Sequence, residues 1–479
     1  MRLGRREFLK LAGASLLSAA ACSSKMNPGK GGIGMPEKRP NILFIFTDDQ
    51  RYDTIHALGN DEISTPTLDG LVRNGVAFTR AYIMGSTVGA VCIPSRAMLM
   101  TGRTLFHVPN DIGDYITFPQ LLGREGYVTF ATGKWHNEPA SFAKSFSSGA
   151  KIFFGGMSDH YKVKVFDFDP TGRYPKEKGY IGEKFSTELF TDAAVEFLRR
   201  YEGDKPFLLY IAYTAPHDPR TPPGRFAEMY DPERIKLPKN FMPRHPFDNG
   251  ELMIRDEKLA PFPRTPEVIK RHIADYYGMI SHLDECVGRL LDVLKETGHA
   301  DNTIIFFAGD NGLAVGQHGL MGKQNLYEHS VRVPLIISGP GIPKGERREA
   351  LCYLLDVFPT ICDLVGLPIP ESVEGISLAP VIRGEKGRIR DTLFFAYKNF
   401  QRAVTDGRFK LIEYFVGGER VTQLFDLEED PWELNNLADD PKYTDQLERL
   451  REEMVRWSAK TNDPLSDLLS KELGKDRFP

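Results

Sequence analysis

The sequence lacks the features that would assign it to several common classes of protein. No internal apolar run is long enough to span a bilayer. The formal net charge is -4 at pH 7, so no basic excess points to a nucleic-acid partner, and none is expected. There is no G-x-S-x-G elbow, phosphate-binding P-loop or H-E-x-x-H motif, which leaves those classes of hydrolase and nucleotide-binding enzyme without support.

Cysteine is also scarce, with five residues in a chain of 479. Cys286 lies in a helical pattern, and Cys352 and Cys362 flank an apolar, helix-like run. We expect these three to be buried free thiols rather than disulfide partners. Cys22 and Cys92 lie in sequence motifs, so packing alone does not account for them.

What the chain does contain is the composition of a globular protein, 41% hydrophobic and 26% charged, with length enough for one large domain or two ordinary ones. Apolar runs rich in β-branched residues alternate with helical patterns, which predicts an α/β fold: a mostly parallel sheet flanked by helices. The expected strands are 41–47, 127–132, 207–213, 303–308 and 334–338, and the expected helices are 65–74, 117–125, 187–201 and 266–297.

The N-terminus has a composition of its own. Arg5 and Arg6 precede a small-residue apolar stretch that ends at Cys22, the pattern of a twin-arginine export signal over 1–22. Residues 19–22 also resemble a lipoprotein cleavage site, although a buried hydrophobic helix is the alternative. We expect an exported protein, periplasmic or lipid-anchored to a bacterial membrane, that uses the twin-arginine machinery. Residues 23–40 are expected to be a flexible tether.

A second pattern begins near residue 386. Short strand patterns separated by tight turns are followed by one amphipathic helix. We therefore expect a catalytic domain over 41–385 and a smaller C-terminal antiparallel-sheet subdomain over 386–465. Residues 466–479 are charged and are expected to form a loosely held tail.

Polar side chains follow four of the predicted strands. Ligands in open α/β sheets bind at the carboxyl ends of the strands, so we expect these side chains to converge on one crevice. They are Asp48 and Asp49 after the first strand, Lys134 and His136 after the second, His217 after the third, and Asp310 and Asn311 after the fourth.

Four of these residues form a candidate metal site. Asp48, Asp49, Asp310 and Asn311 offer carboxylate and amide oxygens, which suit calcium or magnesium better than zinc. A pair of aspartates after a strand could instead cap a helix. The second acidic loop favours the metal.

The segment from Cys92 to Arg96, Cys-Ile-Pro-Ser-Arg, predicts an anion site. A helix that begins at Pro94 would direct its free N–H groups and positive dipole end toward Cys92. Arg96 would lie on the same helix face, four residues on. The alternative is a structural turn with an ordinary thiol.

This segment resembles the C-x-P-x-R signature of the type I sulfatases, and the similarity covers nearly the whole chain after the tether. The resemblance implies an alkaline-phosphatase-like α/β fold with a small C-terminal sheet. It also implies that a formylglycine-generating or sulfatase-maturating enzyme oxidises Cys92 to formylglycine (3-oxoalanine). Other matching segments are TDDQR at 47–51, GKWH at 133–136, APHDP at 215–219, AGDNG at 308–312, HGLMGKQNLYEHSVRVP at 318–334 and LFDLEEDPWELNNLA at 424–438.

The resemblance further implies a mechanism. One hydroxyl of the hydrated aldehyde attacks sulfur, a general acid protonates the leaving oxygen, and the second hydroxyl later expels sulfate. Unmodified cysteine is therefore expected to support little or no turnover. The implied roles are Ca2+ binding by Asp48, Asp49, Asp310, Asn311 and modified Cys92; contact with the formylglycine hydroxyls by Arg96 and Lys134; action on the aldehyde by His136; and contact with the bridging and sulfuryl oxygens by His217 and Lys323.

Two segments, 153–162 and 221–266, have the character of loops that shape a substrate site. Their basic and aromatic side chains suit a sulfated sugar, although solvated surface charge is the alternative for any one of them. We expect substrate contacts from His160, His245 and His318. The expected reaction is desulfation of the chain end of a glycosaminoglycan or algal polysaccharide fragment.

Two other functions fit parts of the sequence. A formylglycine-dependent phosphodiesterase or phosphonate hydrolase would share the fold and the modified cysteine. Two-zinc relatives typically have Asp-His where this chain has Asp310-Asn311, so a zinc-only phosphoesterase is disfavoured. A non-catalytic glycan-binding lipoprotein would have lost reactive positions, whereas every family position that can be matched is intact.

Overall fold

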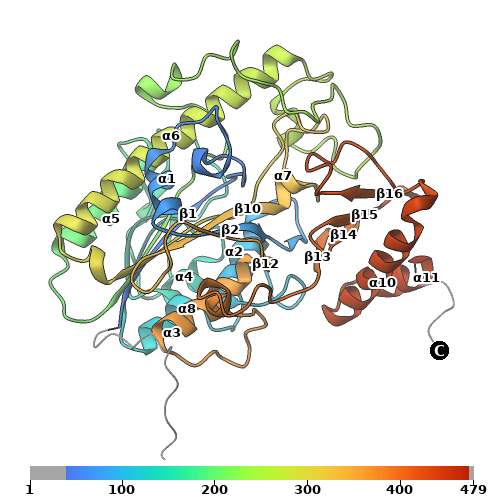
Figure 1. Ribbon diagram of the computed structural model, residues 1–479. Coiled ribbons are helices and arrows are strands. Elements are labelled where there is room, and N and C mark those ends of the chain that lie inside the picture. The colour runs from blue at the N-terminus through green and yellow to red at the C-terminus, as the bar shows by residue number, and fades with distance from the viewer. Residues whose placement is uncertain (1–38, 474–479) are drawn as a thin grey trace, which may run out of the picture. The chain divides into compact units, whose positions relative to one another are not determined.

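A computed structural model describes residues 39–473 (Figure 1). The predicted export signal with Cys22, nearly all of the tether and the last six residues lie outside this range, so export and lipid anchoring remain predictions. Within the described range, no helix is both long enough and apolar enough to cross a membrane.

A nine-stranded sheet forms the centre of the catalytic part. Along its main path the strands are β11 (Glu346–Arg348), β2 (Gly75–Tyr82), β10 (Arg332–Ser338), β9 (Thr303–Gly309), β1 (Asn41–Thr47), β8 (Phe207–Ala212), β4 (Val128–Lys134) and β5 (Ser148–Phe153). A ninth strand, β12 (Cys352–Tyr353), also pairs with β2. β9, β1, β8, β4 and β5 are parallel, whereas β10 runs antiparallel to both of its neighbours. The mostly parallel sheet is confirmed.

Side chains of β1 show how both faces of this sheet are covered. Leu43 and Ile45 pack in one core with α1 (Pro66–Arg73), α5 (Ser186–Arg200) and α6 (Pro266–Glu296). Alternate residues of β1 pack in a second core on the other face, which explains why the whole strand is apolar. That core includes α2 (Cys92–Thr101), α3 (Phe118–Arg124), α4 (Pro139–Ser145) and α8 (Val357–Val365).

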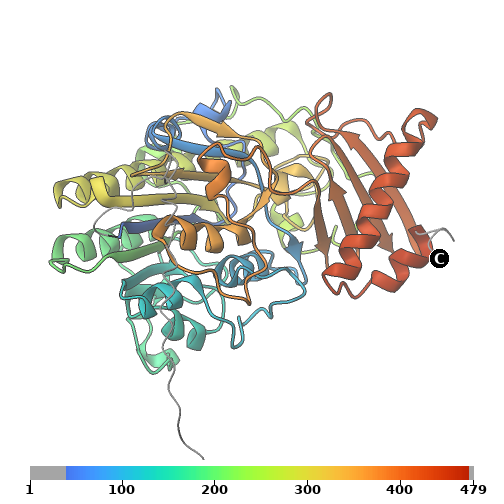
Figure 2. The same cartoon turned by 60° about the horizontal axis from the view of Figure 1, so that its bottom comes forward.

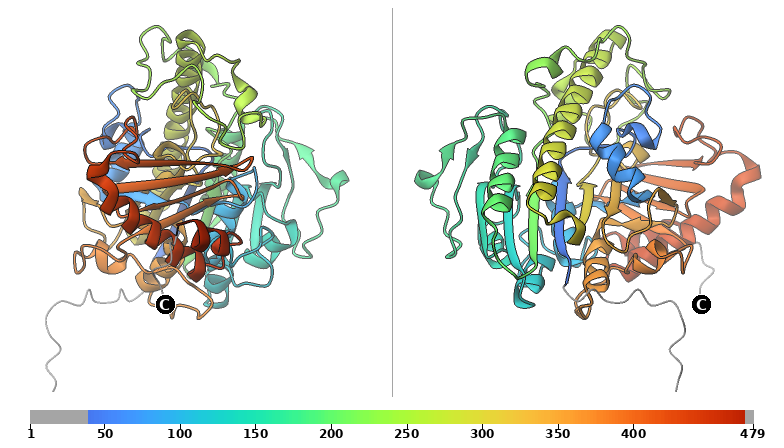
Figure 3. Two further views of the ribbon diagram at one scale, coloured as in Figure 1. Left: turned by 90° about the vertical axis from the view of Figure 1, so that its right-hand side faces the viewer. Right: turned by 60° about the vertical axis from the view of Figure 1, so that its left-hand side comes forward.

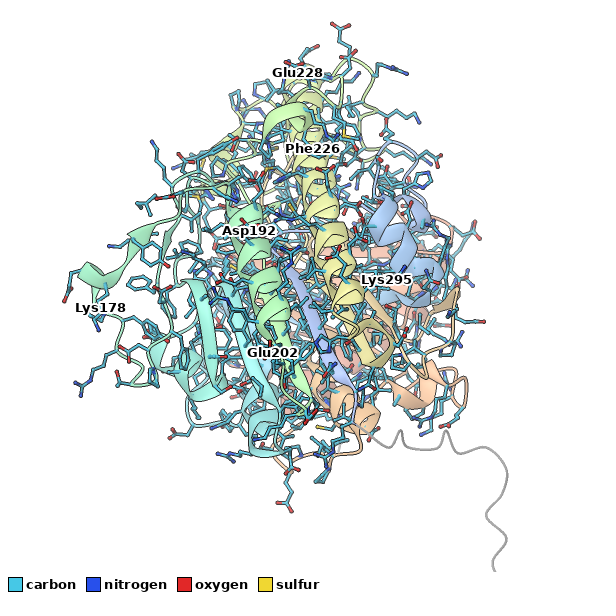
Figure 4. All side chains as sticks on the ribbon, turned by 90° about the vertical axis from the view of Figure 1, so that its left-hand side faces the viewer. Lys178, Asp192, Glu202, Phe226, Glu228 and Lys295 are labelled. Carbon is cyan, nitrogen blue, oxygen red and sulfur yellow. The ribbon has the colours of Figure 1, made fainter. Side chains whose placement is uncertain are left out.

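The helices on the α6 side lie close together. Figure 4 shows α5, which carries Asp192, side by side with α6, which carries Lys295. The same figure shows Lys178, beside the small hairpin of β6 (Lys164–Val165) and β7 (Tyr180–Ile181), out on the flank of the sheet. Two short helices, α7 (Glu328–Val331) and α9 (Ala379–Ile382), complete the catalytic part.

A five-stranded second sheet forms the C-terminal part, with α10 (Thr444–Lys460) packed against it (Figures 2 and 3). The predicted tail is wrong over its first residues: α11 (Ser466–Leu473) packs on α10 and buries Leu469 completely. The strands are, in order, β16 (Glu419–Asp426), β15 (Phe409–Val416), β14 (Gln401–Thr405), β13 (Leu393–Tyr397) and β3 (Gly85–Ser86).

The edge strand β3 comes from the segment that leads into α2, so this sheet is not built only from residues after 386. Gly85 has φ +100°, and a Cβ there would lie 2.0 Å from the Ala396 carbonyl oxygen, so the pairing requires glycine. The C-terminal sheet is thereby joined to the chain a few residues before Cys92. Elsewhere, Cys286, Cys352 and Cys362 are buried and free, as predicted.

Candidate active site

The polar side chains predicted at the strand ends meet at one place. Asp48 follows β1, Lys134 ends β4, His217 follows β8 and Asp310 follows β9, and these four strands are neighbours in the sheet. Cys92 joins them as the first residue of α2, so this helix begins two residues before the predicted start at Pro94. The convergence is confirmed.

The acidic residues form a buried set of oxygen ligands. Side-chain ligand atoms of Asp48, Cys92 and Asp310 lie within 4.8 Å of one another, as do those of Asp48, Asp49 and His217. The Oδ1 atoms of Asp48 and Asn311 are buried and have no hydrogen-bond partner within residues 39–473. Because buried polar atoms are nearly always paired, these two oxygens are suited to bind a cation. Hard oxygen donors of this kind fit a divalent cation such as Ca2+.

Lys134 connects the acidic residues to the cysteine. Its Nζ lies 2.5 Å from Asp48 Oδ2, 3.6 Å from Cys92 Sγ and 2.6 Å from the Gly156 carbonyl oxygen, to which it donates. The Lys134 side chain is completely buried. A buried ammonium is tolerated only when it is paired, so the site fixes the position of this charge next to residue 92.

The other two cations are held in the same way. Lys323 Nζ lies 2.5 Å from Asp49 Oδ1, and Arg96 Nε donates to Asp310 Oδ2 over 3.0 Å. Arg96 Nη1 also donates to the Lys134 carbonyl oxygen at 2.8 Å. Each buried carboxylate is therefore matched by one cation, and these cations can offset the negative charge of a bound sulfate ester.

His136 faces the cysteine directly, with its Nδ1 3.1 Å from Cys92 Sγ. Its backbone is left-handed (φ 60°), and the absence of a side chain at Gly156 leaves room for its ring. Burial, together with Lys134 and Arg96, holds the pKa of His136 far below its ordinary value. The ring is therefore neutral at physiological pH.

The thiol itself is a poor nucleophile in this environment. Burial raises the pKa of Cys92 above its ordinary value, and the opposing effect of Lys134 and Lys323 does not compensate. Burial, followed by the charge of Asp48, raises the pKa of Asp310 to about 7. A divalent cation beside these groups would favour their deprotonated forms.

His217 is held at both its ring and its backbone. Its Nε2 lies 3.5 Å from Asp49 Oδ2, and its Nδ1 is 2.9 Å from the Asp218 carbonyl oxygen. The His217 carbonyl oxygen accepts a hydrogen bond from His160 Nε2 at 2.9 Å. Burial outweighs the neighbouring Asp49 and lowers the pKa of His217.

The three histidines predicted to bind substrate have other contacts. His160 is 1% exposed and uses both ring nitrogens, one on Ser186 Oγ and one on His217, so a substrate contact is not supported. His245 Nδ1 binds the His318 carbonyl oxygen, and the His318 ring stacks on Tyr327. No contact found in the described range joins His245 or His318 to the residues around Cys92.

One further buried group contains possible metal ligands, namely His318, His329 and Glu433. Lys410 Nζ lies 3.0 Å from Glu433 Oε1 and 2.9 Å from Glu328 Oε1. Lys410, on β15, thereby joins Glu328 of α7 to Glu433 and links the catalytic part to the C-terminal part.

The burial of His160 predicts a pH effect on stability. Burial lowers its pKa to about 4, whereas an unfolded chain has a histidine pKa near 6.5. The unfolded state therefore binds more protons between these values, and stability falls as the pH drops through this window. From pH 7 to pH 5, the free energy of unfolding should fall by about 2 kcal/mol more in the wild type than in His160→Gln, because the variant lacks this titrating group. Urea unfolding of both proteins at each pH measures this difference, and identical pH dependence would contradict it.

Sequence reasoning missed several residues that support the site. Ser95 Oγ donates to the Asp310 carbonyl oxygen, and the Gly156 carbonyl accepts from Lys134. Glu257 accepts from the backbone N–H groups of Met321 and Gly322, next to Lys323. Gly156 and Glu257 lie in the two segments that were expected to shape the substrate site. No local pattern gave their partners, because each contact is made across the fold.

Comparison with known proteins gives consistent matches. The family described as Sulfatase matches residues 40–367, and the C-terminal family of N-sulphoglucosamine sulphohydrolase matches residues 316–460. An N-acetylglucosamine-6-O-sulfatase of Bacteroides thetaiotaomicron is 28% identical, with 94% of this chain and 91% of the relative covered.

Solved structures show the same fold. One, in complex with its substrate D-glucosamine-2-N,6-O-disulfate, has a TM-score of 0.75 and 26% identity, covering 90% of this chain and 99% of its own. A phosphonate monoester hydrolase of Agrobacterium radiobacter has a TM-score of 0.71 and 23% identity, covering 88% and 96%. The second likeness concerns the fold alone. Together, the matches confirm the expected alkaline-phosphatase-like fold.

Proposed function

The chain belongs to the sulfatase family and is a sulfuric ester hydrolase, and on this basis we propose that it desulfates a sulfated carbohydrate through a formylglycine at position 92. The observation that carries the proposal is the buried cluster around Cys92. It combines three carboxylates, each paired with a cation, and two oxygens that have no hydrogen-bond partner in the part of the chain that the structure describes.

The proposed cofactors fit the residues present. Asp48, Asp49, Asp310 and Asn311 would hold Ca2+, which polarises the sulfate ester, and the formylglycine would supply the nucleophile. Asp48 and Asn311 contribute the unpartnered oxygens. Residue 92 lies beside this set, within reach of Asp48 and Asp310.

The chain's own side chains would stabilise negative charge and transfer protons. Lys134, whose Nζ lies 3.6 Å from Cys92 Sγ, can hold the hydroxyls of the modified residue, and Lys323 can bind the sulfuryl oxygens. His136, neutral and 3.1 Å from residue 92, accepts a proton from the group at that position. His217 faces the site through Nε2 and donates a proton to the leaving oxygen.

The sugar class follows from the relatives. One is named for N-acetylglucosamine-6-O-sulfate, and a solved neighbour holds a glucosamine disulfate. We therefore propose a sulfated glucosamine at the end of a glycosaminoglycan fragment as the substrate. The experiment is release of inorganic sulfate from defined mono- and disaccharides that differ only in the position of the sulfate.

Such a panel also tests the alternatives. A phosphodiester and a phosphonate monoester are assayed beside the sulfated sugars, with the same enzyme preparation. Preference for sulfate esters of glucosamine by at least about tenfold in kcat/KM supports the proposal, a difference of about 1.4 kcal/mol in transition-state binding. Faster phosphonate hydrolysis would replace it, and no hydrolysis of any ester would favour a glycan-binding role.

A further inference from the structure

We propose that Asp218 and Arg255 form a positioning pair that fixes the ring of His217 for proton donation to the leaving oxygen. The proposal rests on the proposed sulfatase function and assigns roles to two residues outside the cluster around Cys92. Substitution of either residue should therefore lower kcat/KM most for substrates whose leaving group must be protonated.

The first observation is the orientation of the His217 ring. Its Nδ1 lies 2.9 Å from the Asp218 carbonyl oxygen and 3.3 Å from the Asp218 carboxylate Oδ1. Its Nε2 points the other way, to within 3.5 Å of Asp49 Oδ2. With Nδ1–H held by Asp218, Nε2 is the nitrogen that faces the metal ligands and the substrate.

The second observation is that Asp218 is itself fixed. Its side chain is 7% exposed, and its carboxylate accepts hydrogen bonds from Arg255 Nη1 at 2.6 Å and Nη2 at 2.9 Å. Among the described residues, His217 and Arg255 are the charged or titratable groups paired with this carboxylate. A buried carboxylate needs such a partner, and a two-pronged guanidinium bond also sets its orientation.

The third observation places Arg255 at the meeting point of the loops that carry the reaction. Its Nε donates to Asp256 Oδ1, and Asp256 accepts from Gln324, the residue after Lys323. Its Nη1 also contacts Met157 Sδ, one residue after Gly156, whose carbonyl holds Lys134. The Arg255 side chain is 45% exposed, so it can be replaced without opening the core.

The chemistry explains why orientation matters. Sulfur forms a bond to the oxygen of residue 92 as its bond to the ester oxygen breaks. The electron pair of the broken bond stays on the ester oxygen, which takes the proton from Nε2 of the protonated His217 ring. The Nδ1–H bond to Asp218 is kept, and the ring ends neutral. A sugar alkoxide is a poor leaving group and depends on this proton, whereas 4-nitrophenolate leaves readily without it.

The experiment compares two substrates, a glucosamine sulfate and 4-nitrophenyl sulfate, in Asp218→Asn, Arg255→Gln and the double variant. Asp218→Asn should lower kcat/KM for the sugar sulfate by about 10²- to 10³-fold and for the aryl sulfate by less than about tenfold. Arg255→Gln should also lower kcat/KM more for the sugar sulfate than for the aryl sulfate, but both losses should be smaller than those of Asp218→Asn. The double variant should be no worse than Asp218→Asn, because both residues act through one contact.

The matched control is Arg225→Gln, in the same 221–266 segment, where Arg225 is 72% exposed and pairs with Glu285. It should leave both substrates unaffected. Equal losses on the two substrates, or independent losses in the double variant, would overturn the proposal. If Asp218→Asn does not fold, the test rests on Arg255→Gln, which changes a half-exposed residue. A larger loss of kcat/KM on the sugar sulfate than on the aryl sulfate supports the proposal, and equal losses overturn it. No sulfate release from either ester by the wild type would instead refute the proposed function.

Discussion

Cys92→Ala is expected to lose sulfate release almost completely, with kcat/KM at least about 10⁴-fold below that of the wild type. The substitution removes the side chain that becomes the nucleophile and leaves the buried cations and carboxylates in place. Cys92→Ser is expected to be as inactive in the steady state, because a serine hydroxyl that takes up sulfate has no second hydroxyl with which to expel it. Release of inorganic sulfate from the sugar substrate measures both variants.

Cys286→Ala is the matched control for this prediction. Cys286 is also a buried free thiol, but its side-chain contact is His282 on the same helix, α6. Its removal should leave kcat/KM unchanged within about threefold, although a small loss of stability follows from the cavity. A Cys92→Ala enzyme that keeps a tenth or more of the wild-type rate would show that residue 92 is not the nucleophile.

Removal of the divalent cation should have an effect nearly as large. Chelation is expected to lower kcat by about 10³-fold, because the ion supplies several kcal/mol of transition-state stabilisation. It should also lower the melting temperature, since Asp48, Asp49 and Asp310 then lie close together without the ion that holds them. Added Ca2+ should restore both properties, which activity assays and thermal unfolding measure on one sample.

Asn311→Ala tests the metal site at a single ligand, because it removes one ligand oxygen without changing the charge of the site. It should raise the Ca2+ concentration needed for half-maximal thermal stabilisation by about tenfold. Ala substitution of Asn435, an exposed residue of the C-terminal part bonded to Asp430, should leave that concentration unchanged. A chelated wild type that keeps its full rate and melting temperature would contradict the metal site.

Much of the central sheet could be predicted from the sequence because its strands are buried on both faces. β1, β8 and β9 are largely apolar runs, and β4 alternates apolar residues with threonine. All four lead into polar loops, and their observed bounds differ from the predicted ones by no more than two residues. β2 was missed because its partner, β10, is at least 250 residues away and runs antiparallel to it. β3 is two residues long and carries no pattern at all.

The site also contains residues that could be predicted from the sequence and residues that could not. Residues that act at strand ends were predicted because their position follows from topology, and the structure brings Asp48, Lys134, His217 and Asp310 together. His160 was predicted to contact substrate because it lies in a loop near the strand ends, whereas the fold buries it against the His217 backbone. The link from Arg255 to Asp218 spans 37 residues and depends on how two loops meet, which no local pattern encodes.

The most direct test of the account is the mass of the peptide that contains residue 92, taken from enzyme preparations of graded activity. We expect an aldehyde at this position, free or hydrated, in a fraction that rises in proportion to kcat. A fully active preparation in which residue 92 has only the mass of cysteine would contradict it.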